Sequence, residues 1–182
     1  MTEYFEVHER DGAARLAELR LADSPTTPAV VDEYVADAGS LWPEEREAPE
    51  GDESVLTVLP HRGLPGGTPD EVADAFAVDY PDVDFPSAAV VSPDTARNYG
   101  ADAYVLSGAP GVVGHAAAFV DAVVETREAI PDDTALYLPG VATPRNVATL
   151  VYAGVDLVDT DRAVIRGTQG RYLTTDDAYF LE

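Results

Sequence analysis

Short segments in which apolar and polar residues alternate open the chain. Alternation with a period of two is typical of strands that bury one face, and the Asp11-Gly12 pair between the first two segments is typical of a tight turn. We therefore expect a small antiparallel β-sheet at the start. Its strands are predicted over residues 4–9, 14–21 and 29–31.

The following segment is polar and acidic. Residues 32–38 predict a weak helix, and the stretch from Pro43 to Glu53 is so rich in glutamate and aspartate that it predicts a solvated linker. We therefore divide the chain into a first unit of antiparallel strands and acidic linker, residues 1–53, and a second unit, residues 54–182.

From residue 54 onward, short apolar runs alternate with segments of helical spacing. Strands are predicted at 55–59, 87–91, 103–106, 135–138 and 155–158, and the longest helix at about 114–130. Regular alternation of this kind indicates parallel strands joined by right-handed crossovers, hence an α/β fold with about five parallel strands. The last strand would leave a sheet edge at Val155 to Val158 that needs a cover.

That last strand ends on a carboxylate. In the run Gly154 to Thr160, the buried residues Val155, Leu157 and Val158 lead to Asp159, and parallel sheets present catalytic side chains at the carboxyl ends of their strands. The alternative is structural: Asp159 caps the following turn, and Asp156 faces solvent. Asp159 is the candidate catalytic residue.

Composition adds an extreme charge and two absences. The chain has 34 acidic and 11 basic side chains, a formal net charge of -23, and no cysteine; all of its bases are arginine. Without lysine there is no Schiff-base chemistry, lysine-bound pyridoxal phosphate or GxxxxGK phosphate loop. Without cysteine there is no thiolate nucleophile, disulfide or sulfur-bound zinc, and three separated histidines do not suggest a metal site.

The sequence gives no sign of a membrane or a secretory signal. No apolar run approaches the roughly 20 residues that span a bilayer, and the segment Met1 to Glu6 lacks the basic start of a signal peptide. We expect a cytoplasmic protein.

Several motifs together resemble one family. They are the run Gly154–Thr160, the run Arg171–Thr174, LPGVATP at Leu138–Pro144, and the opening segments Phe5–Arg15 and Thr27–Ala29. Together they resemble the archaeal tRNA-guanine transglycosylase superfamily, and within it most closely the archaeosine synthase paralogue, in a version from a salt-loving archaeon. The resemblance implies an incomplete (β/α)8 TIM-barrel-like sheet preceded by a small antiparallel sheet, with the nucleophile toward ribose at Asp159.

The resemblance also implies a function. We expect the transglycosylase-like N-terminal part of a longer tRNA-modifying enzyme, inactive alone, that serves archaeosine formation at a deazaguanine base in the tRNA D-loop. Its expected partners are tRNA and the missing C-terminal part of the same protein; a homodimer stays open, and no membrane is expected. No cofactor is expected in this chain, since the family's zinc site would lie in the missing part.

One element of the family is absent. Base exchange there uses a second aspartate, carried in an aspartate-serine-glycine run, and the nearest string here, Asp37 to Trp42, lacks the residues that follow it. A true tRNA-guanine transglycosylase and a catalytically silent tRNA-binding scaffold therefore remain as alternatives. A metabolic barrel enzyme acting on a small phosphorylated substrate is disfavoured, because the usual lysine is missing.

Further residues are predicted to bind substrate or RNA. His61 and Arg62 follow a strand end in a glycine-rich loop and, with Gly140 and Arg145, are predicted to bind substrate. For the loop that carries His61 and Arg62, an ordinary surface loop is the alternative. A cluster near the end of the chain is predicted to bind RNA, with the tyrosine supplying stacking or core packing: Arg162, Arg166, Arg171 and Tyr172.

The charge itself predicts salt dependence. At about 1 M salt the Debye length falls to roughly 3 Å, which screens repulsion among surface carboxylates. We expect the protein to unfold when the salt is lowered to about 0.1 M, where that length is roughly 10 Å. Circular dichroism across a salt titration measures this, and a spectrum that stays folded at low salt would contradict it.

Overall fold

The computed structural model describes residues 2–38, 51–61, 83–112 and 114–180. The chain begins, as predicted, with a small antiparallel sheet in the order β1 (Phe5–Asp11), β2 (Ala14–Leu19) and β3 (Thr26–Thr27). Gly12, in the turn between β1 and β2, has a φ of 62°, a backbone conformation that glycine adopts without steric cost.

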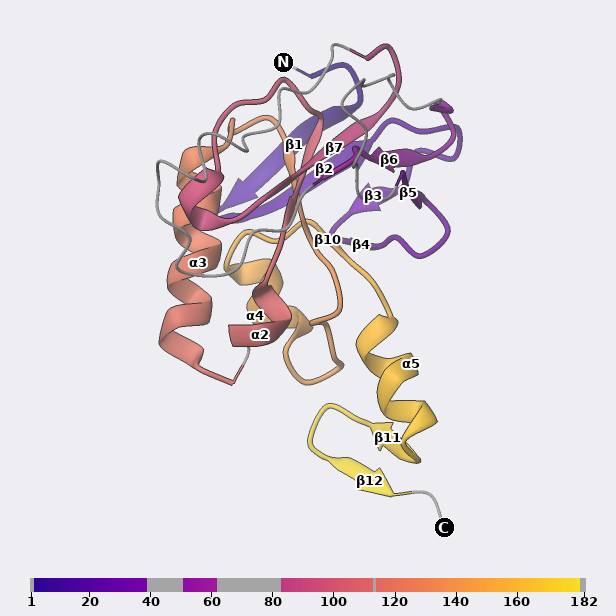
Figure 1. The fold of residues 1–182 in the computed structure, drawn as a ribbon, viewed down its shortest axis with the longest axis vertical. Coiled ribbons are helices and arrows are strands. Elements are labelled where there is room, and N and C mark those ends of the chain that lie inside the picture. The colour runs from indigo at the N-terminus through magenta and orange to yellow at the C-terminus, as the bar shows by residue number, and fades with distance from the viewer. Residues whose placement is uncertain (1, 39–50, 62–82, 113, 181–182) are drawn as a thin grey trace.

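A second, larger sheet follows, in which every paired strand runs parallel to its neighbours. The order is β4-β10-β9-β8-β7-β6-β5, and Figure 1 shows the small sheet lying against it. This arrangement confirms an incomplete TIM-barrel-like α/β fold. The strands are β4 (Ala29–Val30), β5 (Val35–Asp37), β6 (Leu56–Val58), β7 (Ser87–Val91), β8 (Ala103–Leu106), β9 (Ala135–Leu138) and β10 (Leu157–Val158).

Helices connect the parallel strands. The long predicted helix is present as α3, and a shorter helix, α4, begins at Val147 between β9 and β10. No helix among the described residues is long and apolar enough to cross a membrane. The remaining elements are η1 (Pro93–Thr95), α2 (Ala109–Val112), α3 (Ala116–Ala129), α4 (Val147–Tyr152), α5 (Asp161–Thr168), β11 (Arg171–Leu173) and β12 (Ala178–Phe180).

Two predictions about residues 29–38 are wrong. Residues 29–31 do not join the antiparallel sheet, because β4 pairs in parallel with β10. Residues 32–38 contain the strand β5 rather than a helix. In both cases pairing with strands distant in sequence outweighs the local pattern, which is weak over so few residues.

The edge expected at Val155 to Val158 is also absent, because β10 lies between β4 and β9. The amides of Ala29 and Val31 donate to the carbonyls of Asp156 and Val158, each at 2.9 Å. Downstream, the Leu56 amide donates to the Tyr34 carbonyl at 2.7 Å. One segment, residues 29–38, therefore supplies both edges of the sheet, and this curls the sheet toward closure.

The two faces of the curled sheet bury two separate cores. The inner face places Val105, Tyr137 and Leu157 in one cluster with Phe5 and Leu19 of the small sheet. The outer face packs its own apolar side chains, among them Tyr104, Leu136 and Val158, with Val123 of α3 and Leu150 of α4. Burying each large apolar side chain stabilises the fold by about 1.5–3 kcal/mol.

A buried ion pair joins the small sheet to the amino ends of the parallel strands. Arg15 of β2 donates from Nε to Oδ1 of Asp156 at 3.0 Å and also contacts Oδ2 through Nη2. Its Nη1 donates to the carbonyl of Asp132 at 2.8 Å, and Nη2 donates to that of Thr134 at 3.0 Å. Asp156 is 2% exposed, so the reading in which it faces solvent is wrong.

Breaking this pair should be costly. Asp156→Asn leaves the Arg15 guanidinium buried without a counter-charge, and we expect a loss of about 3–5 kcal/mol in unfolding free energy. Chemical denaturation at constant high salt measures it. The matched control is Arg20→Leu, which removes the exposed Arg20–Glu6 pair and should cost about 0–1 kcal/mol. Equal losses in the two variants would contradict the assignment.

Candidate functional site

Asp159 lies where β10 ends, at the carboxyl edge of the parallel sheet. Side chains alternate along a strand, so Asp159 shares the inner face with Leu157 of the inner core. Asp159 is only 6% exposed. The predicted placement at the carboxyl end of a parallel strand is therefore present in the structure.

Three donors hold the Asp159 carboxylate. The Tyr137 hydroxyl donates to Oδ2 at 2.9 Å, and the Gly140 amide lies 2.9 Å from both oxygens. The Asp161 amide donates to Oδ1 at 3.3 Å, so Asp159 also caps the turn that follows it. Because two of the donors come from β9 and the loop after it, the carboxylate orientation depends on the neighbouring strand.

Glycine at position 140 has a backbone reason. Its φ is 68°, in the left-handed region that side chains with a Cβ rarely adopt. Space is not the constraint, since a Cβ there would meet only Pro110, at an ordinary 3.6 Å. The conformation turns the Gly140 amide toward Asp159.

Tyr137 is suited to remain a donor. Burial, and then the negative charge of Asp159, raise the pKa of the Tyr137 hydroxyl above its ordinary value. The hydroxyl therefore keeps its proton throughout the neutral pH range and donates it to the carboxylate.

Two more carboxylates stand near Asp159. Asp32, just after β4, accepts hydrogen bonds from the amide and the hydroxyl of Thr160. The charge of Asp159, then burial and the charge of Asp32, raise the pKa of Asp161. Sequence reasoning missed Asp32 because it assigned residues 32–38 to a helix; an apolar Ala29–Val31 run ending on an acid was the signal.

The predicted substrate residues are only partly brought together. Gly140 contacts Asp159 directly, whereas Arg145 is exposed on the loop between β9 and α4. His61 follows β6 at the same edge of the sheet, and its buried Nδ1 has no hydrogen-bond partner among the residues that the structure describes. Arg62 lies outside the described residues. Their roles in binding stay predictions.

The predicted RNA-binding residues lie on α5 and the β11–β12 hairpin, which extend away from the barrel in Figure 1. Arg162 and Arg166 are one helical turn apart on α5. On the hairpin, Arg171 stacks over the Phe180 ring at 4.8 Å, while Tyr172 is paired with Tyr179. Because neighbours on a strand face opposite ways, Arg171 and Tyr172 lie on different faces of the hairpin.

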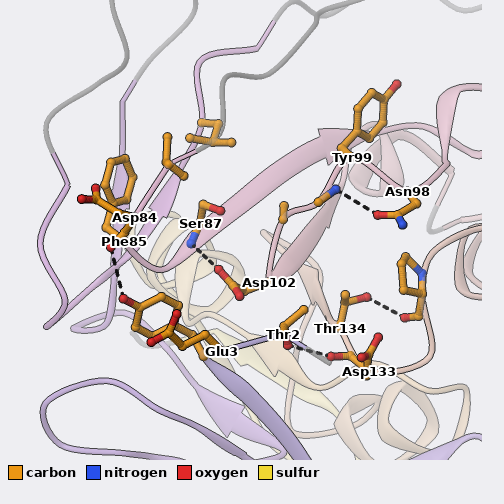
Figure 2. A pocket seen from close by; sticks show the side chains of 16 residues that line it. Thr2, Glu3, Asp84, Phe85, Ser87, Asn98, Tyr99, Asp102, Asp133 and Thr134 are labelled. Atoms are coloured by element: carbon orange, nitrogen blue, oxygen red, sulfur yellow. Dashed lines mark hydrogen bonds between the residues drawn. The ribbon is translucent and has the colours of Figure 1, made fainter.

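A cavity of about 390 Å³ lies at the opposite end of the sheet from Asp159. Its lining includes Ser87 at the start of β7, Asp102 before β8 and Thr134 before β9, as Figure 2 shows. The Ser87 amide donates to Asp102 at 3.0 Å, and burial raises the pKa of that carboxyl. Catalytic side chains of parallel barrels gather at the carboxyl ends, so we place the candidate site at Asp159 instead.

The described ranges contain no group of three or more histidine, cysteine or acidic side chains arranged to hold a metal ion. The group that the site does present is the carboxylate of Asp159, held by three donors. It can attack an electrophilic carbon, accept a proton, or accept a hydrogen bond from a base.

Comparison with known proteins gives a family and two relatives. The sequence model of the family described as "Queuine tRNA-ribosyltransferase" matches residues 87–182, about half of the chain. The archaeosine synthase of Haloferax volcanii is 69% identical over 182 residues, 100% of this chain and 31% of that protein. The archaeosine synthase subunit alpha of Methanosarcina acetivorans is 30% identical over 207 residues, 100% of this chain and 33% of that protein.

These matches confirm the resemblance that the motifs predicted, and the matched segment contains Tyr137, Gly140 and Asp159. The chain spans about a third of the length of the curated relatives it matches.

The raised pKa of Asp161 depends on its two acidic neighbours, and two substitutions test this dependence. Since Asp159 is the largest cause of the raised pKa of Asp161, Asp159→Asn should lower that pKa more than Asp32→Asn does. Carbon-13 NMR of the side-chain carboxyls at fixed salt follows both variants. A raised folded-state pKa favours folding at acid pH, and that contribution is lost as pH rises through it. An Asp161 pKa unchanged by Asp159→Asn would refute the proposed proximity.

Proposed function

The chain belongs to the queuine tRNA-ribosyltransferase family, and from this premise we propose that it is the transglycosylase-like part of a longer tRNA-modifying enzyme. Its task would be archaeosine formation at a deazaguanine base in the tRNA D-loop. The names of the two relatives, archaeosine synthase and archaeosine synthase subunit alpha, support this.

The observation that carries the proposal is the Asp159 carboxylate, which three donors fix at the carboxyl edge of the parallel sheet. Asp159 receives hydrogen bonds from three donors, and a carboxylate has about four lone-pair sites, so about one further partner fits. Donors that are already in place cost no reorganisation when a substrate arrives. That partner would be an everted base or its ribose, since an enzyme that acts on a base takes it out of the stack.

Two roles for Asp159 differ in their bond changes. As a nucleophile, one carboxylate oxygen forms a bond to the ribose anomeric carbon while the glycosidic bond breaks and the base leaves with its electron pair. As a binding residue, it only accepts a hydrogen bond from the base. The missing aspartate-serine-glycine run favours the second role, because base exchange needs a second acid to manage the proton on the base.

Binding of the rest of the tRNA would fall to the arginines and to the loops at the mouth. Arg162 and Arg166 share one face of α5, directly after Asp159, and Arg145 follows the neighbouring strand β9. Arg171 and Tyr172 would add contacts from the hairpin, and His61 with Arg62 would contact substrate from the loop after β6. Gly140 would act indirectly, by holding Asp159.

A catalytically silent scaffold is the competing function. It would bind tRNA through the same surface and leave the chemistry to the remainder of a longer protein. Its supporting observation is again the absence of the second aspartate run, together with relatives about three times as long as this chain.

The test uses the full-length parent protein and tRNA that carries the 7-cyano-7-deazaguanine base. Asp159→Ala should lower the conversion rate by about 10³-fold or more if the carboxylate is a nucleophile, and by about 10- to 100-fold if it only binds and orients. Asp121→Ala, an exposed acid on α3, is the matched control and should leave the rate unchanged. Mass spectrometry of the digested tRNA gives the rate.

Other outcomes separate the alternatives. A parent that converts no base contradicts the proposed function. A parent that converts base at the same rate with and without Asp159, while a gel shift finds equal tRNA binding, indicates the scaffold.

A further inference from the structure

The carboxylate of Asp32 reaches the residue next to the candidate site. Its Oδ1 accepts the Thr160 amide at 2.9 Å, and its Oδ2 accepts the Thr160 hydroxyl at 2.5 Å. The two residues are 128 positions apart in the sequence, and Thr160 directly follows Asp159. We call this pair of hydrogen bonds the Asp32–Thr160 latch.

The latch uses a hydroxyl that would otherwise serve the helix. Thr160 is the N-cap of α5, yet its side chain makes no capping hydrogen bond. Threonine is a favoured N-cap because its oxygen accepts a backbone amide of the first turn, a contact that contributes about 1 kcal/mol. Here the hydroxyl points instead to a carboxylate on β4's side of the sheet mouth.

The latch completes the set of contacts around the turn between β10 and α5. On one side, Tyr137 and Gly140 hold the Asp159 carboxylate from β9 and its loop. On the other side, Asp32 holds the backbone of Thr160 from the segment that follows β4. The turn is thus fixed from both neighbouring strands. Without the latch, the β4 side would keep only the backbone pairing that ends at the Val158 carbonyl, and nothing from that side would hold Thr160.

From this geometry we infer that Asp32 is a positioning residue for Asp159: it fixes Thr160 and thereby aims the carboxylate at the substrate. The inference rests on the proposed function of Asp159. Asp32 itself is exposed and touches Thr160 rather than the inner face, so its effect passes through the turn.

Charge is the competing explanation for any effect of Asp32. Its negative charge contributes to the raised pKa values of Tyr137 and Asp161. Asp32→Asn separates the two explanations, because the amide oxygen accepts the Thr160 amide and the amide NH₂ donates to the Thr160 hydroxyl, while the charge is gone.

The experiment measures kcat and KM for base conversion by the full-length parent and its variants. Asp32→Ala should lower kcat by about 10- to 100-fold with KM within about threefold, as expected when a reacting group is misaligned. Asp32→Asn should stay within about threefold of the parent. Thr160→Val, which removes only the hydroxyl contact, should fall between them. Glu33→Ala, the loss of an exposed acid beside Asp32, should change nothing.

A second readout is independent of activity. Hydrogen exchange of the Thr160 amide, followed by NMR, should be at least about 10-fold faster in Asp32→Ala than in the parent or in Asp32→Asn, because the amide loses its acceptor. Unchanged exchange in Asp32→Ala overturns the latch, even if the parent converts no base and the proposed function fails.

The remaining outcomes are decisive as well. A kcat equal to that of the parent in Asp32→Ala overturns the inference while the proposed function stands. A kcat as low in Asp32→Asn as in Asp32→Ala assigns the effect to charge and also overturns it. If Asp32→Ala does not fold, the kcat of Thr160→Val is compared with those of the parent and Asp32→Asn instead.

Discussion

The buried pair of Arg15 and Asp156 is the contact on which the arrangement of the two sheets depends. The Arg15 guanidinium of β2 donates hydrogen bonds to the Asp156 carboxylate before β10. It also donates to the carbonyls of Asp132 and Thr134 before β9. Neither charge can be exposed without pulling the small sheet from the amino ends of the strands. A charge left alone there would lose both its partner and its hydration, so the pair is kept or lost as a unit.

The same contact sets the site at the other end of β10. Asp156 and Asp159 flank a strand of two residues, and a strand rises only about 3.3 Å per residue, so anchoring Asp156 leaves Asp159 little freedom. The Leu136 amide donates to the Asp156 carboxylate at 2.7 Å, which helps to fix β10 against β9. In that register Leu157 pairs with Tyr137, whose hydroxyl then reaches Asp159.

Sequence patterns predicted what depends on local periodicity and missed what depends on distant pairing. The first hairpin, the helix α3 and the strand ending at Asp159 follow from spacing within a few residues. The pairing of Ala29 and Val31 with β10 does not, because it joins segments that lie more than a hundred positions apart in the sequence. For the same reason the sequence did not predict that Asp32 lies close to Asp159. Nor did it predict that Asp156 is buried in an ion pair with Arg15 of the opening sheet.

The electrostatics of the proposed site constrain how RNA would approach it. Asp32, Asp159 and Asp161 make the mouth negative, so phosphates would be repelled there and a neutral base would be the part of the RNA that enters. The backbone would lie farther out, near arginines whose attraction weakens in salt, which leaves shape and stacking to carry recognition. At about 1 M salt the Debye length is roughly 3 Å, so salt weakens the interaction between charges mainly beyond that separation. The 2.9 Å contacts of Tyr137 and Gly140 with Asp159 fall within that distance. Salt at the concentration expected to keep the acidic surface folded would therefore leave the hydrogen bonds of the Asp159 carboxylate in place.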